Sequence, residues 1–147
     1  MAGTQQTLDP TKVTLIFDGV QIKQFAKGTK IKVTMEADAF SDEVGADGDV
    51  VRLRSADRRG TIDFTLMAGS PSNDYLSAKL IADRLAGGGV GEAQVKDGTG
   101  TSIHHAANAW LKKMPDAEYT TEPGMERAWM LRCAKLESYV GGTTDIE

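Results

Sequence analysis

KIKVTMEADAFSDEVGADGDVVRLRSADRRGTIDFTLM, residues Lys30–Met67, contains two strand-like runs on either side of a long charged insert. In both runs apolar residues alternate with polar ones, which is the pattern of a β-strand with one buried and one solvent-facing side. The apolar positions are Ile31, Val33, Met35, Ile62, Phe64 and Leu66. We therefore expect two strands, Lys30–Glu36 and Gly60–Met67, that each cover a hydrophobic core with one face.

The insert between these strands, residues 37–59, divides by charge. Its acidic half, counted from the end of the first strand, carries Glu36, Asp38, Asp42, Glu43, Asp47 and Asp49. Its basic half carries Arg52, Arg54, Arg58 and Arg59, with Asp57 as its one acid. We read the insert as a long loop with almost no large apolar residues, and such loops are usually functional or disordered. We interpret it as an arm that docks onto another copy of the same chain.

Length and composition are those of one globular domain. The chain has 147 residues, of which 40% are hydrophobic and 26% charged. We expect a single domain over 1–147 with loose ends at 1–11 and 141–147. The net charge of −4 argues against nonspecific nucleic-acid binding as the main role, but it is compatible with a channel through which nucleic acid passes. No apolar run approaches the roughly 18 residues of a membrane span, and no signal-peptide core is present, so we expect a cytoplasmic protein.

Turn signals before the arm predict further strands. Asp18-Gly19 separates the apolar runs Val13–Phe17 and Val20–Phe25. Asp-Gly between such runs is a strong signal for a two-residue hairpin turn in which both central residues have positive φ. Lys27-Gly28-Thr29 forms a second turn and leads into Lys30–Glu36. Three strands therefore precede the arm and one follows it.

The residues after Met67 predict one helix, about 71–86. Ser70 suits the N-cap, Pro71 suits the first helical position, and Asp74 lies at the positive end of the helix dipole. An apolar stripe at helical spacing follows, and three glycines, 87–89, end the helix. The stripe consists of Tyr75, Leu76, Leu80, Ile81 and Leu85.

Hairpin signals return after the helix. Ala93–Lys96 and Thr101–His105 flank the turn at 97–100, and Glu118–Thr121 and Glu126–Leu136 flank Pro123-Gly124. Residues 101–114 and 126–137 fit both a helix and a strand, and the surrounding rhythm of hairpins favours a strand for the second. We expect a mainly β fold, an antiparallel β-sandwich or barrel, with one flanking α-helix (about 71–86) and a long charged arm (about 37–59).

The sequence offers few groups for catalysis. His104 and His105 are adjacent, and neighbouring residues of a strand point to opposite faces, so the pair is poorly placed to share a metal. Cys133 is the one cysteine, which precludes an internal disulfide, and its apolar neighbours predict a buried, inert thiol.

Two other patterns resemble binding loops only superficially. Asp42, Asp47 and Asp49 lack the spacing and the closing glutamate of an EF-hand. The glycines of 87–91 lack the Gly-Lys-Ser/Thr ending of a phosphate loop and close a helix instead of opening one. We expect no catalytic residue, no metal site, no cofactor and no enzymatic activity.

Four segments resemble the tail tube proteins of contractile-tailed bacteriophages. They are SPSNDYL at 70–76, VKDGTG at 95–100, AWLKKMPDAEY at 109–119 and RAWMLRCAKL at 127–136. The order of elements is similar as well, and the resemblance covers about 13–136. It implies a barrel-like protomer, similar in fold to type VI secretion tube proteins, that forms hexameric rings stacked into a tube. Strands of neighbouring protomers would then close one barrel around a lumen.

The resemblance also implies roles for residues. The arm would reach the adjacent ring through Glu36, Asp38, Asp42, Glu43, Asp47, Asp49, Arg52, Arg54, Arg58 and Arg59. The lumen would be lined by Lys30, Lys32, Thr34, Glu36, Thr61, Asp63 and Thr65. A neutral or negative wall lets DNA slide, because phosphates then meet few cations. Lys30 and Lys32 do not fit such a wall unless they pair with Asp63 or Glu36 across the strands, or unless the assignment of faces is inverted.

The implied partners are other copies of the chain, the tail sheath, tape measure, baseplate and tail terminator proteins, and DNA in transit during ejection, with no membrane. The implied location is the virion tail tube, with assembly in the host cytoplasm. Two alternatives remain: a related baseplate or secretion-tube component, and a small β-barrel ligand-binding domain. The latter requires a pocket with convergent polar groups, and the sequence shows no such cluster.

Overall fold

The computed structural model of the protein describes residues 5–28 and 30–142. Thr29 of the expected turn and the outermost parts of the two expected loose ends, 1–4 and 143–147, lie outside the described residues. In chain order the elements are η1 (Pro10–Lys12), β1 (Val13–Phe17), β2 (Val20–Gln21), β3 (Ile31–Met35), β4 (Phe40–Val44), β5 (Val50–Arg54), β6 (Gly60–Met67), α1 (Ser72–Ala86), β7 (Gly91–Asp97), β8 (Ile103–Leu111), β9 (Glu126–Cys133) and β10 (Leu136–Tyr139).

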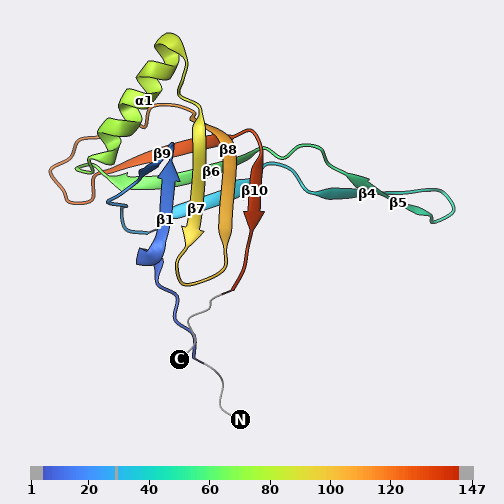
Figure 1. Cartoon of the computed structure of the whole chain (residues 1–147). Helices are drawn as coiled ribbons and strands as arrows, with labels where there is room; N and C mark the ends of the chain where they lie inside the picture. Colours follow the sequence, from blue (N-terminus) through green and yellow to red (C-terminus); the bar gives the residue numbers. More distant parts are fainter. Residues whose placement is uncertain (1–4, 29, 143–147) are drawn as a thin grey trace.

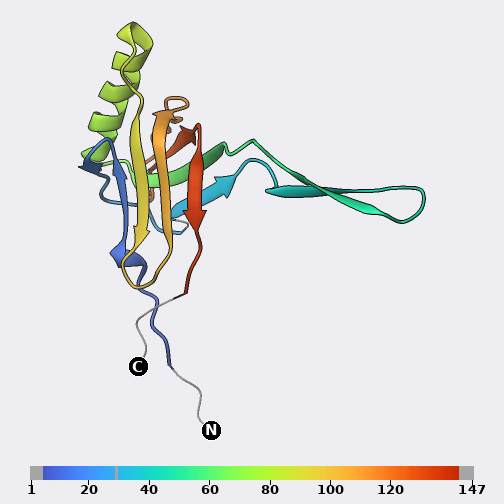
Figure 2. The same ribbon diagram turned by 45° about the vertical axis from the view of Figure 1, so that its right-hand side comes forward.

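One antiparallel eight-stranded sheet forms the body, in the order β2-β1-β7-β8-β9-β6-β3, with β10 also paired to β8. The sheet folds over itself, so that β1, β7, β8 and β10 form one layer and β9, β6 and β3 run across behind it (Figures 1 and 2). Strand β8 makes the corner, because 103–106 pair with β10 while Ala109–Leu111 pair with β9. The expected mainly β, antiparallel sandwich is confirmed.

The core lies between the two layers. The alternation in Gly60–Met67 is confirmed, since Ile62, Phe64 and Leu66 are buried and the residues between them are partly exposed. The buried apolar side chains of the sheet are Leu15, Phe17, Ile62, Phe64, Leu66, Ala93, Val95, Ala106, Ala109, Leu111, Trp129, Leu131, Cys133 and Leu136. Both ambiguous segments are strands, β8 and β9, that contribute side chains to this core, so the choice of strand for the second is confirmed.

Helix α1 closes one end of the sandwich (Figure 1). Leu76 and Leu80 are buried against the sheet, and Asn73 accepts a hydrogen bond from the indole Nε1 of Trp129 at 2.9 Å. The helix ends as expected, with Gly87 and Gly88 at positive φ. The cap is one residue later than expected, at Pro71, while the hydroxyl of Ser70 accepts from the backbone N–H of Ser72 at 3.2 Å.

The apolar stripe of the helix is only partly buried. Ile81 and Leu85, which the helical spacing assigns to the core, are exposed. The reason is geometric: the C-terminal half of α1 extends past the edge of the sheet, so only its first turns have a surface to cover (Figure 2). This half of the helix therefore presents apolar side chains to solvent.

Two predicted strands are shorter than expected or absent. The run Val20–Phe25 is regular only over Val20–Gln21, because Gln24 has φ of 60° and breaks the extended backbone. The preceding turn is as predicted, with positive φ at Asp18 and Gly19. Glu118–Thr121 forms no strand within the described chain; it belongs to an irregular connection between β8 and β9.

The described parts of the two ends are anchored to the body. Asp9 caps η1 by accepting from the backbone N–H of Thr11 at 3.0 Å. At the other end, the carbonyl of Gly142 accepts from the backbone N–H of Thr101 at 3.0 Å, and Gly141 donates to Ser102 Oγ at 2.9 Å. Lys12 O accepts from the backbone N–H of Gly98 at 3.1 Å, so residues 10–12 and 141–142 lie at the lower edge of the sandwich.

Candidate functional site

The charged insert is a β-hairpin that projects away from the body (Figures 1 and 2). Strands β4 and β5 pair antiparallel over five register pairs, from Phe40↔Arg54 to Val44↔Val50. The backbone N–H of Gly45 donates to Asp49 O at 2.8 Å across the turn. The expectation of a long loop is therefore wrong, because the two halves of the insert form strands, β4 and β5, that pair with each other. Neither strand packs on the body.

The arm also carries more apolar surface than expected. Five large apolar side chains on β4 and β5 are substantially exposed, which contradicts the expectation that almost none are present. They are Phe40 (44%), Val44 (64%), Val50 (63%), Val51 (54%) and Leu53 (48%). A two-stranded ribbon has no core of its own, so these side chains remain in water in the single chain. Such a surface marks an interaction site.

The hairpin brings the acidic and the basic half of the arm side by side. Asp42 lies directly opposite Arg52 in the register, and the guanidinium of Arg52 lies over the ring of Phe40 at 4.2 Å from its centroid. Residues opposite each other share one face of the ribbon. The arm residues predicted to pair with the next ring are all exposed: Glu36, Asp38, Asp42, Glu43, Asp47, Asp49, Arg52, Arg54, Arg58 and Arg59.

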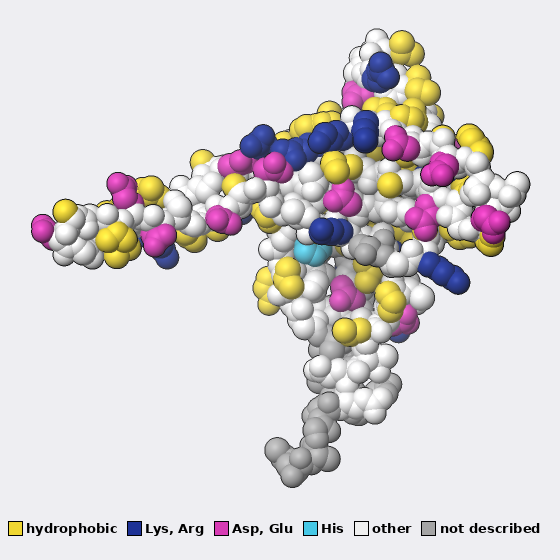
Figure 3. Space-filling model, turned by 180° about the vertical axis from the view of Figure 1, so that it is seen from behind, with side chains coloured by type: hydrophobic (Ala, Val, Ile, Leu, Met, Phe, Trp, Pro, Cys, Tyr) yellow, Lys and Arg dark blue, Asp and Glu magenta, His cyan; other side chains and the backbone are white. Residues whose placement is uncertain are grey.

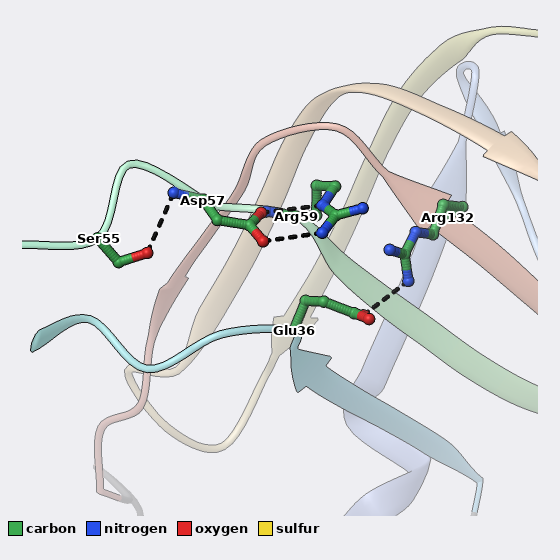
Figure 4. Close-up of polar contacts among 5 residues, drawn as sticks. All are labelled: Glu36, Ser55, Asp57, Arg59 and Arg132. Atoms are coloured by element: carbon green, nitrogen blue, oxygen red, sulfur yellow. Dashed lines mark hydrogen bonds and ion pairs between the residues drawn. The ribbon is translucent and has the colours of Figure 1, made fainter. Parts of the chain in front are cut away.

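Two ion pairs secure the root of the arm (Figure 4). Arg132 on β9 donates to Glu36 at 2.7 Å, and Arg59 donates to both carboxylate oxygens of Asp57 at 2.9 Å each. The side-chain hydrogen bonds from Arg59 are the main reason that the pKa of Asp57 is lowered to about 2, and the hydrogen bond from Arg132 is the main reason that the pKa of Glu36 is lowered. Glu36 and Arg59 are thus already paired within the chain.

Backbone contacts fix the same region. Glu36 N–H donates to Arg59 O at 2.9 Å, and Leu136 N–H donates to Arg58 O at 2.8 Å. Gly60 lies in close contact with the Leu136 side chain, and a Cβ at this position would also come within 2.9 Å of Thr34 O. The root is therefore packed and hydrogen-bonded like the body, although the hairpin beyond it is free.

The predicted lumen residues lie on the outer face of the β3–β6–β9 layer, with one difference. Lys32 is opposite Asp63 and Thr34 is opposite Thr61, so these side chains share a face. Thr65 continues the same row on β6. Lys30 precedes β3, and its ammonium donates to the carbonyls of Pro10 and Val13 at 2.8 Å each.

That outer face carries both signs of charge. Figure 3, which views the molecule from behind, shows a row of Lys and Arg side chains across it, with Asp and Glu side chains nearby. Arg132 contributes to this face, since it lies opposite Thr61 on β6 and Trp110 on β8. Arg132 was not among the residues predicted for this face, although its place between the apolar residues Leu131 and Cys133 is a signal for a solvent-facing position.

The remaining candidate groups are partnered separately. His104 Nδ1 lies 2.9 Å from Ser138 Oγ, whereas His105 Nε2 lies 3.2 Å from Glu92, so the two rings face opposite sides of β8. Cys133 is buried, which raises the pKa of its thiol to about 11. Among the described residues no three His, Cys, Asp or Glu side chains are grouped to hold a metal ion, and no helix there is long and apolar enough to cross a membrane.

This fold, a folded-over antiparallel sheet with one end helix and a projecting arm, is similar to that of chains in solved contractile injection systems. The chain is similar to a solved sheath/tube terminator of an extracellular contractile injection system (TM-score 0.67, 8% identity, 92% of this chain and 99% of that chain). It is also similar to a chain of the sheath–tube complex of such a system, with a TM-score of 0.63 and 10% identity over 91% of this chain and 92% of that chain. A third similar structure is the tube-terminating cap of the anti-feeding prophage, with a TM-score of 0.62 and 9% identity over 95% of each chain.

Sequence comparison narrows this class. The chain belongs to the bacteriophage PhiTE tail tube protein family, whose model matches residues 12–141. It is 25% identical over 154 residues to a structural protein of Pseudomonas phage KPP10, covering 99% of this chain and 88% of that protein. The resemblance to phage tail tube proteins is therefore confirmed, and as a member of this family the protein is a structural component of a phage tail.

Proposed function

We propose that this protein assembles with copies of itself into hexameric rings, and that the rings stack into the inner tube of a contractile phage tail through which DNA leaves the particle. Membership of a tail tube family and the fold shared with solved injection-system tubes support this role. The tube is a structural element and performs no catalysis. Its function follows from self-association, so the decisive surfaces are those that a second copy can cover.

The observation that carries the proposal is the uncovered hairpin. Its five exposed apolar side chains extend from the body on a paired, twisted ribbon that has no second layer to pack on. Burying such side chains contributes about 25 cal/mol per Å² of apolar surface, whereas an exposed ion pair contributes roughly 0–1 kcal/mol. The apolar side chains of the arm therefore supply most of the contact energy between rings, and its charges supply orientation.

The β3–β6–β9 outer face is the surface proposed to line the lumen, with Thr34, Thr61, Asp63 and Thr65 exposed to the passing DNA. Two features make this face compatible with sliding. Arg132 is already paired with Glu36, and Lys32 lies opposite Asp63, so phosphates meet partly neutralised cations. The ammonium of Lys30 is held by backbone carbonyls and contributes little to this wall.

Other partners follow from the same role. A tube inside a contracting tail contacts the sheath on its outside and the tape measure protein in its lumen, and its ends contact the baseplate and the tail terminator. The protein would be made and assembled in the host cytoplasm and then reside in the virion.

Electron microscopy of the purified full-length protein over a concentration series tests the proposal. We expect rings and tubes of uniform diameter. A matched variant replaces residues 40–54 with Asn-Gly between Ala39 and Ser55, which are already joined by a hydrogen bond from Ser55 N–H to Ala39 O at 2.9 Å. This variant should fold and should form at most single rings. Rings that never stack in the unaltered protein would favour a terminator or baseplate role, and a strictly monomeric protein would contradict self-assembly.

A further inference from the structure

An open hollow of about 560 Å³ lies at the end of the body opposite the arm. It is bounded by the start of α1 on one side and by the connection between β8 and β9, residues 112–125, on the other. Met114, Tyr119 and Met125 line it and are exposed, with Trp129 beneath them. Methionine side chains adapt to the shape of a partner, and exposed apolar patches of this kind are typical of interaction sites.

The hollow and the arm lie at opposite ends of the same strands. Strand β6 begins at Gly60, at the root of the arm, and ends at Met67, beside the hollow; β9 runs the other way, from Glu126 at the hollow to Cys133 at the root. A second copy displaced along these strands therefore presents its hollow to the arm of the first. Such a head-to-tail contact does not close on itself, so it repeats indefinitely along one axis.

The arm is long enough for this contact. From residue 37 to the start of the turn at residue 45, the outgoing half of the arm covers roughly 30 Å at about 3.3 Å per extended residue. Strand β6, which spans the body between root and hollow, covers about 26 Å over its eight residues. A hairpin of this length therefore reaches the hollow of a second copy that is displaced along these strands by up to about twice the length of β6.

The charges of the two surfaces are complementary. The border of the hollow, residues 112–127, contains four acids, Asp116, Glu118, Glu122 and Glu126, and three cations, Lys112, Lys113 and Arg127. Arg127 lies over the ring of Tyr119, and Asp74 at the start of α1 adds a fifth acid to the lining. Figure 3 shows Asp and Glu side chains, with hydrophobic ones, at the end of the body far from the arm. One face of the hairpin combines Phe40, Val44 and Val50 with Arg52 and Arg54 and with one acid, Asp42, as the register requires. An apolar face on which arginines outnumber acids thus matches an apolar hollow on which acids outnumber cations.

We propose that the face of the hairpin formed by Phe40, Val44, Val50, Arg52 and Arg54 docks into the hollow between α1 and residues 112–125 of a second copy in the next ring. This inference rests on the proposed stacking and adds the surface that receives the arm. The apolar side chains enter the hollow, and the two arginines meet the acids of its rim.

Disulfide trapping tests the contact directly. The double variant Val50→Cys/Ala117→Cys places one thiol on the hairpin and one in the hollow, both at exposed positions, while Cys133 stays buried. After oxidation of assembled tubes, we expect a ladder of covalent polymers on a denaturing, non-reducing gel, because each chain carries both halves of the contact. The control variant Val50→Cys/Lys96→Cys, with its second thiol exposed on β7 in the other layer, should give no ladder.

The outcomes separate the two proposals. Normal tubes of the first variant without a ladder would overturn the docking surface and leave stacking intact, and the hollow would then be free for another partner such as the sheath. Failure of the unaltered protein to form any tube would overturn stacking and this inference with it.

A charge exchange gives a second readout. Arg52→Glu/Arg54→Glu should raise the protein concentration needed for tubes about threefold or more, because like charges then face each other across the contact. Glu118→Lys/Glu122→Lys should do the same, and the four changes together should restore tubes. If each double variant is impaired and the fourfold variant does not regain tubes, the arginines and the acids belong to different contacts and the proposed pairing is overturned.

Discussion

Replacing two valines of the hairpin isolates its apolar contribution to stacking. Val44 and Val50 lie opposite each other and are 64% and 63% exposed in the single chain. Full burial of a valine contributes about 1.5 kcal/mol. About two thirds of each side chain remains to be buried, so the pair contributes about 2 kcal/mol to each arm contact. The double variant Val44→Ser/Val50→Ser should therefore weaken each contact about 25-fold, since 1.4 kcal/mol corresponds to a factor of ten.

The assay is a concentration series of purified protein, with tubes quantified by sedimentation and by electron microscopy. The melting temperature of the unassembled chain should stay unchanged, because exposed substitutions usually alter stability by less than about 0.5 kcal/mol. The matched control Ile81→Ser/Val90→Ser removes exposed apolar side chains elsewhere on the body and should assemble normally. An unchanged threshold concentration for the hairpin variant would refute the reasoning, and a large drop in melting temperature would show that the valines stabilise the single chain.

Three further predictions concern the single chain. Ion pairs lower the pKa of Asp57 from 3.8 to about 2 and also lower that of Glu36, so they stabilise the root of the arm above pH 4 and cease to do so as the pH falls towards 2. NMR titration of the carboxyl carbons should place the Asp57 midpoint near 2, and a midpoint near 4 would contradict the ion pair with Arg59. Burial of Cys133 should prevent its reaction with a thiol reagent at pH 8 until the protein is unfolded, and rapid labelling of the native chain would contradict that burial. Gly60→Ala should lower the free energy of unfolding in urea by about 1–3 kcal/mol, because the added methyl group collides with Leu136 and Thr34 O, whereas an unchanged value would mean that the root repacks freely.

The sequence predicted the body well, because there each pattern coincided with a physical requirement. Gly60–Met67 alternates since one of its faces covers the core, and its bounds as β6 are the predicted ones. The helix was recognisable from Pro71 and the glycines after Ala86, which limit its ends. Ile81 and Leu85 fit the stripe equally well but are exposed, since spacing reports which face a residue lies on and not whether the sheet extends beneath it.

The arm was harder to predict because no buried face selects its pattern. Both sides of β4 and β5 are exposed, so one face of β4 carries Asp42 between Phe40 and Val44, and the alternation of Val51–Arg54 does not mark a buried side. The sequence shows the position of the arm between two strands and its charge, but it does not show that β4 and β5 pair with each other. Arg132 was missed for a related reason: its partner Glu36 is 96 residues away, and only the β3–β6–β9 register brings the two together.

The continuity of the arm with β3 and β6 determines how the chain carries mechanical load. A pull on the hairpin acts along these two strands (Figure 2). Strand β6 is held to β9 by eight register pairs that lie across the direction of the pull. The load is therefore shared by the whole ladder in shear, and no single end of the ladder opens first. A stack of such chains would therefore resist stretching through the strand ladders of its sheets.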